Sequence, residues 1–145
     1  MPAQESMSQA LALPVAARHA ATIQNTTGDS GGLDMRKFRR AIFFCSVGTN
    51  ASSASVIFKL QESTDDVTYT DVTGGATAAV TAANQQFTLE VRADQLTKRY
   101  VRCRCTESAN QVCTMSIMAL GCDAIAKPGG KGRTEAASVA ERLVV

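Results

Sequence analysis

Tryptophan is absent from this chain of 145 residues, aromatic residues make up only 5% of it, and histidine occurs once. The chain therefore has few aromatic rings that could stack on a flat ligand and only one imidazole that could transfer a proton. The only histidine, His19, lacks the positioned partner that a general base needs, and no such partner accompanies a Ser or Cys nucleophile. We expect a protein that is not an enzyme and that holds no cofactor or metal.

Long hydrophobic runs are also missing. No segment approaches the roughly 20 apolar residues of a membrane span, and residues 1–20 lack the basic start and apolar core of a signal peptide. We expect a chain that is made and kept in a cytoplasm, with no membrane partner. The five cysteines agree, because their number is odd and most lie in apolar strand patterns. Cys103 and Cys105 share a strand face, but no histidine joins them in a zinc site.

The charge balance is nearly even, with a formal net charge of +2. Bulk electrostatics therefore give no reason to expect direct binding of nucleic acid. The densest basic cluster surrounds Phe38 and consists of Arg36, Lys37, Arg39 and Arg40. We favour a solvated strand end as its interpretation, and contact with an acidic neighbouring subunit is the second hypothesis.

The clearest positive signal is a hairpin over residues 56–72. Val56, Phe58 and Leu60 alternate with their neighbours, and the alternation resumes at residues 67–70 after a polar break. Period two is typical of a half-buried strand. Asp and Ser side chains in the break, residues 63–66, can accept hydrogen bonds from backbone amides two residues further on. The pattern predicts two strands joined by a tight turn.

Further strands are predicted at residues 21–25, 41–47, 86–91, 99–106 and 113–122, separated by turns rich in Gly, Asn, Asp and Ser. This spacing predicts an all-β fold, an antiparallel β-sandwich or jelly roll of about seven to eight strands. We place an N-terminal arm at residues 1–20, the sandwich at 21–122 and a C-terminal arm at 123–145. Residues 41–47 and 118–120 are apolar on both faces, so these strands lie either in the middle of the domain or under another chain.

The C-terminal arm has a pattern of its own. Residues 126–132 form a linker, and Thr134 can cap a helix that begins at Glu135. One apolar stripe follows at helical spacing, formed by Ala136, Val139, Ala140, Leu143 and Val144. A helix this short is marginal alone, so we expect it to dock on something.

One dense carboxylate group deserves a chemical interpretation, and it consists of Glu62, Asp65, Asp66 and Asp71. Paired carboxylates can serve glycoside hydrolysis, or calcium binding when more oxygen ligands join them. Capping and solvation of the hairpin turn is the interpretation that we favour, because it fits turn chemistry.

Four segments in order carry a resemblance to a known family: FRRAIFFCSVGT, VIFKLQESTDDVTYTDV, a polar Ala/Thr stretch, and KRYVRCRCT followed by MSIMALG. Together they cover about residues 38–121. In this order the chain resembles a family of small β-rich structural proteins encoded among the head and tail genes of tailed bacteriophages. The family usually has a Gly in the hairpin turn, where this chain has Asp66 and Val67.

The resemblance implies a virion structural protein, a decoration or cement subunit on the capsid exterior that bridges neighbouring major capsid protein subunits. Its partners would be the major capsid protein and further copies of itself. We expect the arms, residues 1–20 and 127–145, to make contacts between subunits. Phe43, Met118 and Leu120 are expected to line a self-association face. The full set of candidate partner contacts is Arg36, Lys37, Arg39, Arg40, Phe43, Met118, Leu120, Val139 and Leu143.

Two alternatives remain open. A tail, baseplate or head–tail component of the same phage module would contact tail proteins instead of capsid ones. A carbohydrate-binding sandwich would stack exposed aromatic rings, such as Tyr69 or Tyr100, on a sugar. The shortage of aromatic residues counts against this second alternative.

Overall fold

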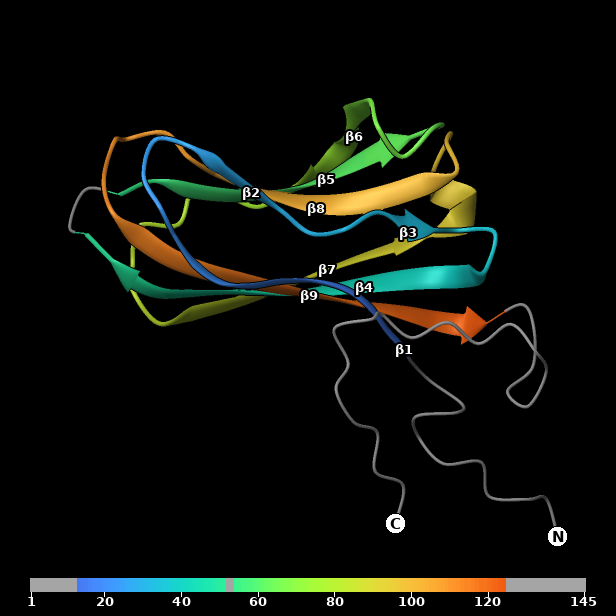
Figure 1. Cartoon of the computed structure of the whole chain (residues 1–145), viewed down its shortest axis with the longest axis horizontal. Coiled ribbons are helices and arrows are strands. Elements are labelled where there is room, and N and C mark those ends of the chain that lie inside the picture. Colours follow the sequence, from blue (N-terminus) through green and yellow to red (C-terminus); the bar gives the residue numbers. More distant parts are fainter. Residues whose placement is uncertain (1–12, 52–53, 125–145) are drawn as a thin grey trace, which may run out of the picture.

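A computed structural model describes residues 13–51 and 54–124 of the chain, and it is an antiparallel β-sandwich (Figure 1). Within these residues the strands are β1 (Leu13–Ile23), β2 (Thr27–Asp29), β3 (Leu33–Asp34), β4 (Phe38–Asn50), β5 (Val56–Ser63), β6 (Tyr69–Ala76), β7 (Gln85–Arg92), β8 (Tyr100–Glu107) and β9 (Cys113–Ala124). Among the described residues the only helical element is a 3₁₀ turn, η1 (Ala93–Gln95). The predicted all-β sandwich is confirmed.

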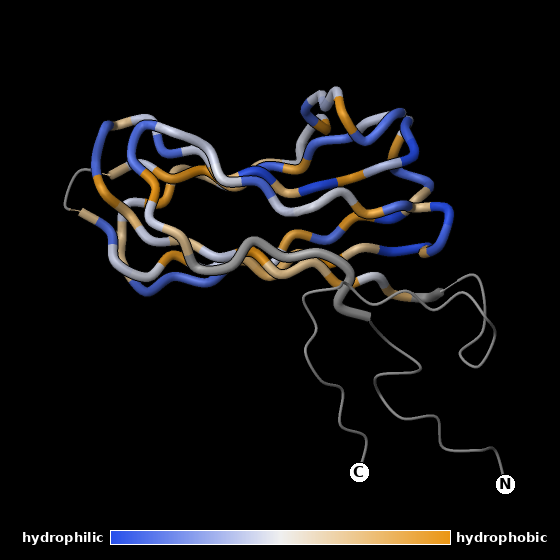
Figure 2. The backbone as a smooth tube through the Cα atoms, in the orientation of Figure 1, coloured by the Kyte–Doolittle hydropathy of each residue, from blue (hydrophilic) through white to orange (hydrophobic). Residues whose placement is uncertain are grey.

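The two layers have different memberships. One sheet has the strand order β1-β9-β4-β7, and the other has the order β2-β8-β5-β6 with the short β3 also paired to β8. Every strand pair is antiparallel. Figure 1 shows the two sheets stacked face to face, and Figure 2 shows hydrophilic residues gathered in the loops at both ends. The central strands β4, β9, β5 and β8 therefore carry most of the core.

Strand β4 shows how the sequence builds this core. Its burial alternates from residue 41 onward, and the inward side chains are at most 2% exposed: Ala41, Phe43, Cys45 and Val47. From the other sheet, Val101, Cys103 and Cys105 of β8 are fully buried. Small and β-branched residues with few rings suit a thin interior between two sheets.

The β5–β6 hairpin is confirmed, with Ser63 opposite Tyr69 at its closed end. Asp65 Oδ1 accepts hydrogen bonds from the amides of Val67 at 3.0 Å and Thr68 at 2.8 Å. Asp66 has a φ of 62°, in the left-handed region that favours glycine. Asp66 therefore adopts a backbone conformation that glycine reaches at lower cost.

Several boundaries differ from the predictions. Strand β1 begins at Leu13, so the prediction of an arm reaching to residue 20 is wrong. Antiparallel pairing with β9 explains the difference, because the backbone of residues 13–23 completes the sheet edge although its sequence lacks a clear alternation. The short strands β2 and β3 lie in a stretch predicted to be mostly turn. The helix predicted from Glu135 lies outside the described residues.

A close contact joins Phe38, the first residue of β4, to Gly121 of β9. Phe38 is 4% exposed, and its ring occupies the space beside Gly121, where an added Cβ would lie 2.6 Å from ring atoms. Only glycine allows this approach without a shift. The ring of Phe38 therefore anchors the polar cluster around it to the core.

Candidate interaction surface

The outer faces of the two sheets differ in chemistry. On the β8–β5 face, both Asp29 carboxylate oxygens accept hydrogen bonds from the Arg104 guanidinium, at 2.7 and 2.8 Å. Arg102 donates to Gln61 Oε1 at 2.9 and 3.1 Å and lies 3.9 Å from the centre of the Tyr69 ring. The charged groups of this face are thus bound to one another.

The outer face of β4 and β9 is apolar instead. Ile42 lies opposite Leu120 and Phe44 lies opposite Met118 in the β4–β9 register. Phe44 is 43% and Met118 is 45% exposed, while Ile42 and Leu120 are partly buried. We call these four side chains the apolar block. No side chain of the described residues fully covers the block, so this apolar surface is a candidate interaction site.

Polar pairs frame the apolar block along the strands. Toward one end, the Ser46 and Ser116 hydroxyls are hydrogen-bonded at 2.7 Å. Toward the other, the guanidinium of Arg40 lies 3.3 Å from the Glu90 carboxylate. An apolar centre with a polar border is the usual anatomy of a protein–protein interface.

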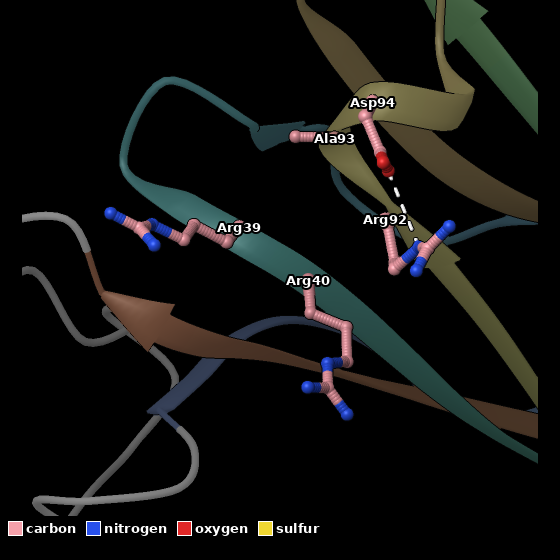
Figure 3. Close-up of a pocket in the computed structure, with 5 residues that line it drawn as sticks. All are labelled: Arg39, Arg40, Arg92, Ala93 and Asp94. Carbon is pink, nitrogen blue, oxygen red and sulfur yellow. Dashed lines mark ion pairs between the residues drawn. The ribbon is translucent and has the colours of Figure 1, made fainter.

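Basic residues follow the apolar block at the Arg40 end of the sheet. Arg92 lies opposite Arg40 across β4 and β7, and Arg36, Lys37 and Arg39 lie at or just before the start of β4. We call these five residues the basic rim. A pocket of about 340 Å³ lies within this rim and is lined by Arg39, Arg40, Arg92, Ala93 and Asp94 (Figure 3). Figure 3 shows the three guanidinium groups pointing in different directions, and Arg92 pairs with Asp94 at 3.3 Å. Guanidinium groups that do not converge make a poor site for one small anion, so the rim fits a broad acidic surface better.

The structure places the predicted contact residues unevenly. Met118 and Leu120 belong to the apolar block, and the four predicted basic residues belong to the rim. Phe43 is fully buried between the sheets, so the expectation that it lines a self-association face is wrong. The adjacent Phe44 takes that outward position, because alternation along β4 turns every second side chain out. Val139 and Leu143 lie outside the described residues.

Ile42 and Phe44 are the members of the surface that the sequence reasoning missed. The signal was present, because residues 41–47 are apolar on both faces. Strand β4 lies in the middle of its sheet, between β9 and β7, yet its outward apolar side chains stay partly exposed.

Each carboxylate of the hairpin group accepts at least one hydrogen bond from the protein. Asp71 accepts hydrogen bonds from Lys59 at 2.8 Å and Gln61 at 2.6 Å, and Asp66 accepts one from the Tyr69 hydroxyl. Amide donors from Thr68 and Val67 and the Ser63 hydroxyl lower the pKa of Asp65 to about 2. These carboxylates are held as hydrogen-bond acceptors within the turn, in agreement with the structural interpretation.

The two tyrosines have guanidinium neighbours. Arg102 lies over the Tyr69 ring, and Arg99 lies 4.8 Å from the centre of the Tyr100 ring. Asp34 holds Arg99 in place through two hydrogen bonds, of 2.6 and 3.0 Å. Each tyrosine thus has an aromatic face already in use, which leaves less surface for stacking on a sugar.

The five cysteines are buried and none forms a disulfide. Cys45 and Cys103 approach each other across the sandwich, with 3.6 Å between their sulfur atoms. In the part of the chain that the structure describes, no three His, Cys, Asp or Glu side chains are arranged to hold a metal ion. The same part contains no helix long and apolar enough to cross a membrane.

Comparison with protein-family models and with curated proteins finds no match to this chain. Its function must therefore be inferred from its surfaces together with the sequence resemblance.

Proposed function

We propose that this chain is a virion structural protein of a tailed bacteriophage, a decoration subunit on the capsid exterior that bridges neighbouring major capsid protein subunits. The observation that carries the proposal is the outer face of β4 and β9, where the apolar block borders the basic rim. The resemblance of residues 38–121 to phage head and tail proteins supplies the identity of the partner. The proposed role includes no catalytic step and no cofactor.

The surface supports a binding role in physical terms. Burial of the apolar block supplies hydrophobic free energy, and the basic rim favours an acidic partner surface and rejects a basic one. A specific interface buries roughly 800 Å² on each partner. Four partly exposed side chains supply only a share of that area, so the contact must extend over the rim and the neighbouring β1 edge of the same sheet.

Stabilisation of a capsid follows from preferential binding. A subunit that binds the assembled lattice more tightly than the free capsid protein shifts the equilibrium toward the lattice. Further copies of the chain, bound at equivalent positions, add to the effect because each bridge acts on subunits already held together. The charged network on the opposite face, around Asp29 and Arg104, would then face solvent.

The direct test is cosedimentation of the purified chain with head particles assembled without it. We expect binding in a fixed ratio to the major capsid protein. Phe44→Asp combined with Met118→Asp should abolish it, because the variant buries two carboxylates in the contact. Val67→Asp combined with Val112→Asp is the matched control, since these exposed side chains, at 79% and 46%, lie outside the apolar block.

The proposal fails if the wild-type chain does not bind the particles. Binding to purified tail or baseplate assemblies would then favour the tail alternative. A signal on a glycan array that Tyr69→Ala or Tyr100→Ala removes would favour sugar recognition instead.

A further inference from the structure

The apolar block and the C-terminal segment both present apolar side chains that could pack against each other. The block is an apolar surface that the described residues do not fully cover, and half of it lies on β9, the last described strand before the C-terminal segment. The segment 134–145 has the sequence pattern of a short amphipathic helix, with an apolar stripe that includes Val139 and Leu143. A helix of that length needs a surface to dock on.

We propose that in the free subunit the segment 134–145 docks as an amphipathic helix on the apolar block of its own chain. Val139 and Leu143 would then lie against Phe44, Met118 and their neighbours. This inference is independent of the virion role, because it concerns the isolated subunit and names no particle.

The connection is long enough to allow this contact. Strand β9 ends at Ala124, four residues beyond Leu120 and six beyond Met118. At about 3.3 Å per residue, these positions lie roughly 13 and 20 Å back along the strand. The linker between Ala124 and Thr134 contains Pro128 and three glycines. The ten Cα–Cα steps from Ala124 to Thr134 span roughly 17 Å on average and at most about 36 Å, so the segment can turn back over the block.

The dimensions of the predicted helix also fit. Residues 135–145 in helical form measure about 16 Å, at about 1.5 Å per residue. Strands β1, β9 and β4 are adjacent in that order, and neighbouring strands lie about 4.8 Å apart. One helix of this length crosses all three strands and covers the four side chains of the block.

The same chain is favoured over a second copy as the source of the segment. A short flexible linker gives the tethered segment an effective concentration of about 1 mM near the block. A free copy reaches parity only when the protein itself approaches that concentration. At micromolar concentrations the intramolecular contact therefore dominates.

Docking has a consequence for any partner of the block. A partner that binds there must displace the segment. Its apparent association constant is therefore the intrinsic constant multiplied by the fraction of molecules in which the block is uncovered. The segment thus protects the exposed apolar surface of the free subunit from nonspecific association.

Oxidation of methionine by dilute hydrogen peroxide, followed by mass spectrometry of the full chain, tests the proposal. Met118 reports on the block, while the core residues Met35 and Met115, at 6% and 2% exposed, report on the integrity of the fold. The test variant is Val139→Asp combined with Leu143→Asp, which removes the apolar stripe. The control, Ser138→Asp combined with Arg142→Gln, changes the opposite side of the predicted helix and lowers the net charge by the same amount.

We expect Met118 to oxidise about tenfold faster in the test variant than in the wild type or the control, as for a block left uncovered in about 10% of wild-type molecules. Met35 and Met115 should remain slow in all three proteins. Equal Met118 rates in the wild type and the test variant would overturn the proposal. It would also be overturned by wild-type protection that is lost on hundredfold dilution, because a second copy would then be the cover.

Discussion

Glu62 and Thr97 are joined by two hydrogen bonds across 35 residues of sequence. The Thr97 hydroxyl donates to Glu62 Oε1 at 2.6 Å, and the Thr97 amide donates to Oε2 at 2.8 Å. Oε2 also accepts the Lys98 amide at 3.1 Å, so one carboxylate at the end of β5 orders the loop that leads into β8. The side chain is almost completely buried, which makes each of these bonds matter for stability.

Glu62→Gln should therefore lower the free energy of unfolding by about 1–3 kcal/mol, because the amide group replaces one accepting oxygen by a donor that faces donors. Urea unfolding followed by circular dichroism measures the change. Glu90→Gln is the matched control, since its carboxylate is 48% exposed and pairs with a surface guanidinium. That substitution should cost less than about 1 kcal/mol. Equal losses in the two variants would contradict the assigned role of Glu62.

The stability of the domain should fall in acid. Burial acts to raise the pKa of Glu62 and of Glu107, but hydrogen bonds outweigh it and the pKa of each is lowered. For Glu62 these bonds come from the Thr97 hydroxyl and from the amides of Thr97 and Lys98, and for Glu107 they come from backbone amides. The pKa of Asp65 is lowered to about 2 by the amide of Thr68, the hydroxyl of Ser63 and the amide of Val67. A carboxyl group with a lowered folded-state pKa stabilises the fold above its unfolded pKa of about 4, and this contribution is lost as the pH falls through the folded value.

Urea midpoints measured from pH 7 to pH 2 test this expectation. The midpoint should be insensitive to these carboxylates above about pH 5 and should decline between about pH 4 and pH 2. Asp65→Asn should reduce the decline, because it removes one titrating group while its side-chain oxygen still accepts hydrogen bonds. An unchanged acid slope in Asp65→Asn would show that the turn carboxylate does not contribute.

The packing of Phe38 on Gly121 makes a third prediction. Gly121→Ala places a methyl group where ring atoms already lie at 2.6 Å, so it should destabilise the domain by about 1–3 kcal/mol through overpacking. Phe38→Leu removes the ring and should make the added methyl tolerable. A double-mutant cycle measured by urea unfolding should therefore show a coupling between the two positions. Additive losses would show that the methyl group is accommodated without involving the ring.

The sequence predicted the parts of this fold in which periodicity and turn chemistry agree. Residues 56–72 show both, and the hairpin formed as predicted, including the Asp65 acceptor. Residues 99–106 alternate cleanly, and Val101, Cys103 and Cys105 are buried as the pattern requires. Strand β1 was placed too late because its pairing depends on β9, about a hundred residues away, which local propensity does not register.

The candidate interaction surface was only half predictable for a similar reason. A strand sequence that is apolar on both faces predicts an unusual outer surface. It does not show which of its side chains point inward, because that depends on the pairing register. Phe43 and Phe44 are adjacent and chemically identical, and a shift of one residue exchanges their roles. The pairing of Phe44 with Met118 across β4 and β9 decides the matter, and only the folded sheet contains that information.

The buried cysteines give a final prediction about reactivity. The hydrogen bond with Cys45, together with burial, raises the pKa of the Cys103 thiol, and burial also raises the pKa of Cys105. The thiolate is the reactive form, and all five thiols are shielded from solvent. After reduction and removal of the reductant, Ellman's reagent should therefore label none of them rapidly in the folded protein. The same reagent should label all five in guanidinium chloride. Rapid labelling of any thiol under native conditions would show that the sandwich opens on the timescale of the reaction, because the distance of 3.6 Å between the Cys45 and Cys103 sulfur atoms leaves no room for a reagent between the sheets.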